Sequence, residues 1–143
     1  MLVVDANVVL SAVLGIRTRR ALGAIGALRL LVMSAQAERE VRLVAGDVLQ
    51  RRGHGEAQID LFLASIEIVP AERYGNTLSA AEIALRNAVA SRNGSERGAH
   101  VLALAWTLEA DIWSHDRDFA GTGWPSWSST NLLAALIAAG QDA

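Results

Sequence analysis

Cysteine and lysine are both absent from this sequence of 143 residues, and each absence excludes a class of chemistry. Without cysteine there are no disulfides and no thiolate metal sites, so a metal ion would need oxygen or imidazole ligands. Without lysine, a phosphate-binding P-loop and a Schiff-base enzyme are excluded. All 13 basic residues are arginines, whose planar guanidinium groups can still bind phosphates through paired hydrogen bonds.

Long apolar runs are missing as well. The richest apolar segment, residues 21–37, is interrupted by Arg29 and by two glycines, and no run reaches the roughly 18 apolar residues that a membrane span needs. Residues 1–5 show no basic region ahead of a long apolar stretch, so we expect no signal peptide. The sequence therefore predicts a soluble, cytoplasmic protein that does not enter the membrane.

The composition that remains is typical of a globular chain. Hydrophobic residues make up 52% and charged residues 20%, and the length suits a single domain over residues 1–143. Aromatic residues are scarce at 5%, whereas alanine, leucine and valine are abundant, which favours helices packed on a small sheet. The net charge of -2 provides no bulk attraction to nucleic acid.

Apolar periodicity predicts strands that alternate with helices. Strands are expected at residues 2–4, 30–33, 66–69 and 111–114, with a short edge strand at 124–128. Helices are expected at 7–14, 34–52, 56–65, 78–90, 99–108 and 129–139, and another runs from an N-cap at Thr18 to Leu28. On the 34–52 helix, the apolar stripe is expected at Ala37, Val41, Val44 and Val48. This order predicts an α/β fold, a three-layer sandwich in which helices flank a small, mainly parallel central sheet.

Two of the predicted strands lead into aspartates, Asp5 and Asp116. If these strands are parallel neighbours, both carboxylates project from the same edge of the sheet, where ligands bind in such folds. Crowded carboxylates repel each other unless a cation intervenes, and hard oxygen ligands select magnesium or manganese. Such a metal ion would activate water for attack on a phosphodiester. The alternative is that each aspartate only caps the helix that follows it.

At four places, in the right order, the sequence resembles the PIN-domain family. The matching segments are VVDANVVLSA at 3–12, VLALA at 101–105, SHDRDF at 114–119 and GWPSWS at 123–128. The resemblance implies a Mg²⁺- or Mn²⁺-dependent endoribonuclease of the kind that acts as the toxin in bacterial toxin–antitoxin pairs. It further implies an RNA substrate, a cognate antitoxin protein that masks the site, and a homodimer.

The resemblance also implies roles for individual residues. Asp5 and Asp116 would be metal ligands and catalytic residues, and Asp118 would be an additional or outer ligand. Asn7 and Ser114 would orient these acids by hydrogen bonds.

Two further acidic positions leave alternatives open. The family places a catalytic glutamate on the helix after the second strand; Glu40 fits, and Glu38 is its rival because both flank the apolar stripe. The family also places an aspartate where this chain has Gly98, so one acidic ligand is missing. Glu96 would replace it as a metal ligand, or would only favour the helix dipole in the first turn.

Arginines near these motifs are candidates for RNA binding. Arg17, Arg19 and Arg20 form the densest basic cluster, and Arg117 stands between two aspartates. We expect them to contact RNA phosphates, which give affinity without sequence choice. A solvated helix start and screening of the acids are the alternative explanations.

Two other classes of function are alternatives to the nuclease. A non-catalytic PIN-like binding module would follow from the acid lost at Gly98. A haloacid-dehalogenase-type phosphatase also begins with a strand-end aspartate, but its pattern needs a second aspartate where this chain has Asn7, and a distal lysine. The phosphatase is therefore excluded.

Overall fold

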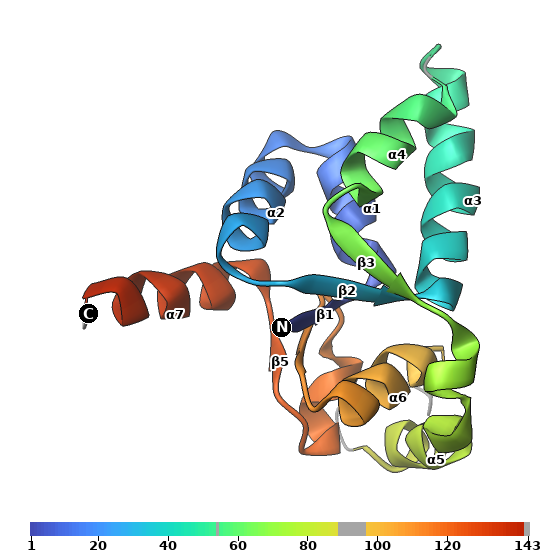
Figure 1. Cartoon of the computed structure of the whole chain (residues 1–143), viewed down its shortest axis with the longest axis vertical. Coiled ribbons are helices and arrows are strands. Elements are labelled where there is room, and N and C mark those ends of the chain that lie inside the picture. The colour runs from blue at the N-terminus through green and yellow to red at the C-terminus, as the bar shows by residue number, and fades with distance from the viewer. Residues whose placement is uncertain (54, 89–96, 142–143) are drawn as a thin grey trace.

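The computed structural model of the chain describes residues 1–53, 55–88 and 97–141, and at its centre is a five-stranded parallel sheet (Figure 1). The strands lie in the order β3-β2-β1-β4-β5, and every neighbouring pair is parallel. Their bounds are β1 Leu2–Val4, β2 Leu31–Ser34, β3 Ile66–Val69, β4 Asp111–Trp113 and β5 Ser126–Trp127. The predicted α/β sandwich is confirmed, and its sheet is parallel throughout.

Helices cover both faces of this sheet (Figure 1). Their bounds are α1 Ala6–Leu14, α2 Ile16–Leu28, α3 Ala35–Arg51, α4 Glu56–Leu63, α5 Leu78–Asn87, α6 Ala99–Leu108 and α7 Ser129–Gln141. Single turns of 3-10 helix occupy Ala71–Arg73 and Gly75–Thr77, and a longer one occupies Arg117–Thr122. Among the described helices, none has both the length and the apolar character that crossing a membrane requires.

Two details of the predicted helices were wrong. Helix α2 begins at Ile16, so Thr18 lies inside its first turn and Gly15 holds the N-cap position. On α3 the buried stripe is Ala37, Val41, Ala45 and Leu49, because this is the face that packs against the neighbouring helices, among them α1 and α4. Val44 is exposed instead, and it lines a cavity beside Glu40.

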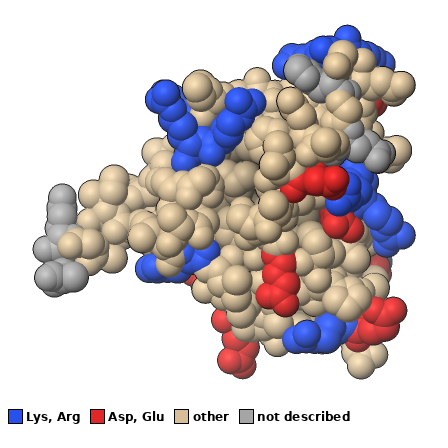
Figure 2. Space-filling model, turned by 45° about the horizontal axis from the view of Figure 1, so that its top comes forward, with Lys and Arg blue, Asp and Glu red and all other residues tan. Residues whose placement is uncertain are grey.

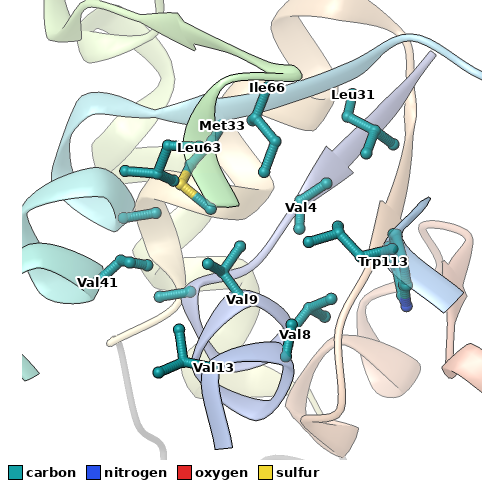
Figure 3. Close-up of a cluster of buried hydrophobic side chains, with 14 of the residues drawn as sticks. Val4, Val8, Val9, Val13, Leu31, Met33, Val41, Leu63, Ile66 and Trp113 are labelled. Carbon is teal, nitrogen blue, oxygen red and sulfur yellow. The ribbon is translucent and has the colours of Figure 1, made fainter. Parts of the chain in front are cut away.

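Alternation along each strand divides the core into two parts. On one face, β1 and β2 contribute Leu2, Val4, Leu31 and Met33, which pack with Trp113 against helices α1 to α4 (Figure 3). On the other face, Val3, Val32, Val69 and Ile112 pack against α5 and α6. Residues 99–105 of α6 are all buried, as its apolar surface predicted.

The register of the sheet determines which residues meet at its carboxyl edge. Val4 pairs with Trp113, and the backbone N–H of Asp5 donates to the carbonyl of Trp113 at 3.0 Å. The next residues, Asp5 and Ser114, therefore lie side by side as the two strands end. Ser34 ends the neighbouring strand β2 at the same edge.

Candidate active site

Asp5 is held at the sheet edge by a network centred on the Ser114 hydroxyl group. Ser114 Oγ donates to Asp5 Oδ2 at 2.7 Å and accepts from Asn7 Nδ2 at 3.3 Å and from the Asp116 backbone N–H at 2.9 Å. Asn7 also accepts a hydrogen bond from the backbone N–H of His115 at 3.1 Å. The predicted supporting residues thus connect Asp5 to the loop that carries Asp116.

The environment of Asp5 opposes its negative charge. Burial raises the pKa of this carboxyl group above its ordinary value, while the hydrogen bonds from Ser114 and the Ala6 backbone lower it, and the nearby charge of Asp116 raises it. The side chain is only 9% exposed. A cation beside Asp5 would offset both the burial and the repulsion.

Asp5, Glu40 and Asp116 line one cavity of about 540 Å³ at this edge of the sheet. They come from the end of β1, from α3 and from the loop after β4. Burial and the charge of Asp5 raise the pKa of Glu40, whereas Arg97, which lines the same cavity, lowers it. The structure therefore brings the three predicted catalytic residues together.

The two candidate glutamates differ in whether they line this cavity. Glu40 lines it, whereas the rival Glu38 pairs with Arg42 on the surface of α3, with 3.7 Å between Oε2 and the guanidinium nitrogen. Of the two candidates, Glu40 is therefore the one that lines the cavity with Asp5 and Asp116.

A second cavity of about 460 Å³ adjoins the first. It is lined by Asn7, His115, Asp116, Arg117 and Asp118, and it shares Asn7 and Asp116 with the first cavity. The Asp118 backbone N–H donates to Asp116 Oδ1 at 3.0 Å. Asp118, predicted as an additional ligand, thus lines the second cavity and not the one that Glu40 lines.

The donor set fits a hard divalent cation in its chemistry, since all three cavity carboxylates offer oxygen ligands. Within the described ranges, however, no three acidic or histidine side chains already stand close enough to enclose one metal ion. Asp116 and the Glu40 side chain, which is 46% exposed, reach solvent at the cavity, whereas Asp5 is buried. Binding of one ion by all three would require their carboxylates to come closer together.

The missing acid at Gly98 has a steric explanation. A Cβ atom at this position would lie 2.6 Å from Cζ and 3.0 Å from Cε1 of Phe119, which is itself buried. The ring of Phe119 therefore fills the space that a side chain at position 98 would need. Glu96, the suggested replacement ligand, lies outside the described residues.

The predicted basic cluster on α2 lines neither of the two cavities. Arg19 donates to the carbonyl groups of Ala12 and Val13 at the end of α1 and lies 5.4 Å from the ring centre of Phe62. Arg17 and Arg20 are exposed, but the nine residues of α1 separate this region from Asp5, a helix length of about 13 Å. Figure 2 shows that the basic side chains on that face form separate groups around its edge instead of one continuous patch.

The sequence analysis identified neither Arg97 nor His100 as part of the site. Arg97 lies in a polar segment without periodicity, so no local pattern could assign it to the cavity. His100 is fully buried on α6, and its ring contacts Ser34, which lies 66 positions away in the sequence. A polar residue within the otherwise apolar stretch 99–105 was the available signal.

The chain is thus a parallel α/β sandwich with acidic side chains near the carboxyl ends of its strands. The chain matches the PIN domain family model over residues 3–137, and it belongs to that family. PIN domains are generally nucleases and typically bind divalent metal ions. A comparison with curated protein sequences found no match.

Proposed function

We propose that this protein is a metal-dependent endoribonuclease that acts as the toxin of a toxin–antitoxin pair. The observation that carries the proposal is the shared cavity of Asp5, Glu40 and Asp116 at the carboxyl edge of the sheet. Membership of the PIN family supports the nuclease reaction. The choice of RNA as substrate and the toxin role rest on the sequence resemblance.

Asp5, Glu40 and Asp116 would hold Mg²⁺ or Mn²⁺ in this cavity. When bound, such an ion lowers the pKa of a coordinated water and stabilises negative charge that develops on a phosphate. Asp5 provides the fixed part of the site because Ser114 and the sheet hold it in place. Asp116 and Glu40 provide the part of the site that faces the open cavity, because their side chains reach solvent.

The two adjoining cavities provide a path for the RNA strand. Arg97 lines the first cavity and Arg117 lines the second, with Asp116 common to both. An RNA strand crossing both would place its reactive phosphate near the acids, with the two guanidinium groups close to phosphates on either side. We therefore assign the main phosphate contacts to Arg97 and Arg117 rather than to the cluster on α2.

The proposal includes two protein partners and a cytoplasmic location. A cognate antitoxin would inhibit the enzyme by covering the joined cavities. A second copy of the chain would pack on the apolar surface where Leu28 of α2 meets Leu136 and Ile137 of α7, a helix without charged residues. Light scattering of wild type and Ile137→Glu tests this, and two monomeric proteins would contradict it.

The nuclease proposal is tested by cleavage of a labelled RNA in the presence of Mn²⁺ and by growth after induction in cells. Asp5→Asn and Asp116→Asn should lower the cleavage rate by at least about 100-fold and should relieve growth arrest. Asp47→Asn is the matched control, because this exposed acid on α3 pairs with Arg51 and does not line the cavity. Cleavage and growth arrest that persist in both site variants would refute the proposal.

A PIN-like binding module without catalysis is the second candidate. Two observations favour it: the blocked position at Gly98, and the lack of three converged ligands in the described part of the chain. Thermal unfolding with and without Mn²⁺ distinguishes the two functions, because a ligand that binds the folded state raises the unfolding temperature. A module without a working metal site would show no such rise.

A further inference from the structure

His100 lies between a buried serine and the glutamate of the cavity. Its Nδ1 is 2.7 Å from Ser34 Oγ, and its Nε2 is 3.4 Å from Glu40 Oε1. Ser34 is 0% exposed and His100 is 2% exposed, whereas the Glu40 side chain is 46% exposed. The three residues thus form a line from the core to the cavity, and they come from β2, α6 and α3.

Ser34 is fixed by two tasks at the junction of β2 and α3. Its Oγ accepts the backbone N–H of Ala37 at 3.0 Å, which caps the N-terminus of α3. Because Ser34 Oγ accepts from Ala37, its hydroxyl hydrogen can be donated to His100 Nδ1. The proton of a neutral ring then sits on Nε2, on the side that faces Glu40.

The sequence of serine, histidine and acid does not make Ser34 a nucleophile. A nucleophilic serine must reach the substrate, but Ser34 has no exposed surface and its hydroxyl group caps a helix. The only member of the line with substantial exposure is Glu40, and it lines the cavity with Asp5 and Asp116. Ser34 and His100 can therefore act on the cavity only through Glu40.

We infer that His100 is a positioning residue that, anchored by Ser34, orients the Glu40 carboxylate toward the cation site shared with Asp5 and Asp116. This inference rests on the proposed function. A glutamate on a helix surface has many side-chain rotamers, and a fixed donor beside one oxygen reduces that number and leaves the other oxygen for the cavity.

The neutral state of the ring agrees with this role. Burial lowers the pKa of His100 to about 4, a hydrogen bond between the ring and the Arg97 backbone raises it, and the charge of Arg39 lowers it. A neutral imidazole donor can orient a carboxylate without cancelling the negative charge that a cation requires.

The test measures Mn²⁺ affinity of the full chain by isothermal titration calorimetry, a readout that does not depend on catalysis. His100→Met removes the donor at nearly constant volume and should weaken Mn²⁺ binding by about 10- to 100-fold. His100→Gln retains an N–H donor and should bind Mn²⁺ more tightly than His100→Met does. In the Glu40→Ala background, His100→Met should cause no further loss, because the residue through which it acts is gone.

Leu102→Ala is the control for general destabilisation of α6, because Leu102 is fully buried and does not line the cavity. Its Mn²⁺ affinity should equal that of wild type. If His100→Met does not fold, Ser34→Ala takes its place, since it removes the Oγ contact with Nδ1, and it should weaken Mn²⁺ binding by several-fold.

The outcomes separate this inference from the function on which it rests. If the wild type binds no Mn²⁺, or if Glu40→Ala binds as tightly as wild type, the proposed metal site fails and the inference fails with it. If Glu40→Ala weakens binding while His100→Met and Ser34→Ala match wild type, only the role of His100 is overturned. The role of His100 would also be overturned if His100→Met weakened Mn²⁺ binding equally in the wild-type and the Glu40→Ala backgrounds.

Discussion

Replacement of Gly98 by alanine would place a Cβ atom 2.6 Å from Cζ of Phe119, far inside the usual carbon–carbon separation of about 3.5–4.0 Å. The backbone at Gly98 has φ -90° and ψ 7°, which other residues can adopt, so the substitution has no conformational penalty of its own. If the new side chain met no other atoms, Gly98→Ala would stabilise the protein by about 0.4–1 kcal/mol, because alanine reduces the conformational entropy of the unfolded chain. Overpacking against a buried ring costs about 1–3 kcal/mol, so the clash should outweigh this gain.

Urea unfolding followed by tryptophan fluorescence measures the effect, since the chain has four tryptophans. We expect Gly98→Ala to lower the free energy of unfolding by about 1–2 kcal/mol, which moves the midpoint by roughly 0.5–1 M for a protein of this size. In the Phe119→Leu background, where the ring is absent, the same substitution should cost less. The coupling between the two positions should be about 0.5–3 kcal/mol.

Gly23→Ala is the matched control, because Gly23 lies within α2 and a Cβ atom there would meet nothing within 4 Å. That substitution should stabilise the protein by about 0.5–1 kcal/mol. The steric explanation is refuted if Gly98→Ala is as stable as Gly23→Ala, or if its cost is the same with and without the Phe119 ring.

Two further predictions concern single polar side chains, both measured by urea unfolding of the metal-free protein. Burial lowers the pKa of His100 in the folded protein to about 4, so the unfolded chain binds a proton at a higher pH than the folded protein does. As the pH falls from 6.5 to about 4, the free energy of unfolding should therefore decrease by up to about 3 kcal/mol. His100→Gln should not show this decrease. Ser114→Ala should cost about 1–3 kcal/mol, because it removes the hydroxyl donor of the buried Asp5, whereas Ser114→Thr retains that hydroxyl.

The sign of the pH effect separates His100 from the acids around it. Asp5 and Glu40 have raised pKa values, so the stabilisation that they contribute is present below their ordinary pKa and is lost as the pH rises. His100 acts in the opposite direction, and the comparison with His100→Gln isolates its share. Equal pH profiles of these two proteins would contradict the first prediction, and equal stability of Ser114→Ala and Ser114→Thr would contradict the second.

The strand ends were predictable because short apolar runs stop at polar residues. Residues 2–4 and 111–113 are buried strands, and parallel pairing alone brings Asp5 next to Ser114 across 109 positions of sequence. The buried character of α6 followed from its apolar surface on all sides. These features depend on local pattern and on general rules of sheet geometry.

The remaining features depend on contacts that no local pattern contains. Periodicity places Glu38 and Glu40 on either side of the same stripe, and only the approach of α6, with His100, distinguishes them. The buried stripe of α3 depends on the helices that pack against it, α1 and α4 among them. Arg19 was assigned to RNA because it lies in a basic cluster, but its position depends on Phe62 of a distant helix.

The charge at Asp5 argues for a bound cation over a purely structural role. Asparagine at this position could accept the same hydrogen bond from Ser114 without the unfavourable burial of a carboxylate. The raised pKa of Asp5 means that the ionised site destabilises the metal-free fold at neutral pH, and Asp116 and Glu40 add to the repulsion. Sites that keep such unfavourable charges are commonly functional, because the charge is needed when a ligand arrives. A divalent cation between these carboxylates would turn the repulsion into attraction, which packing alone cannot do.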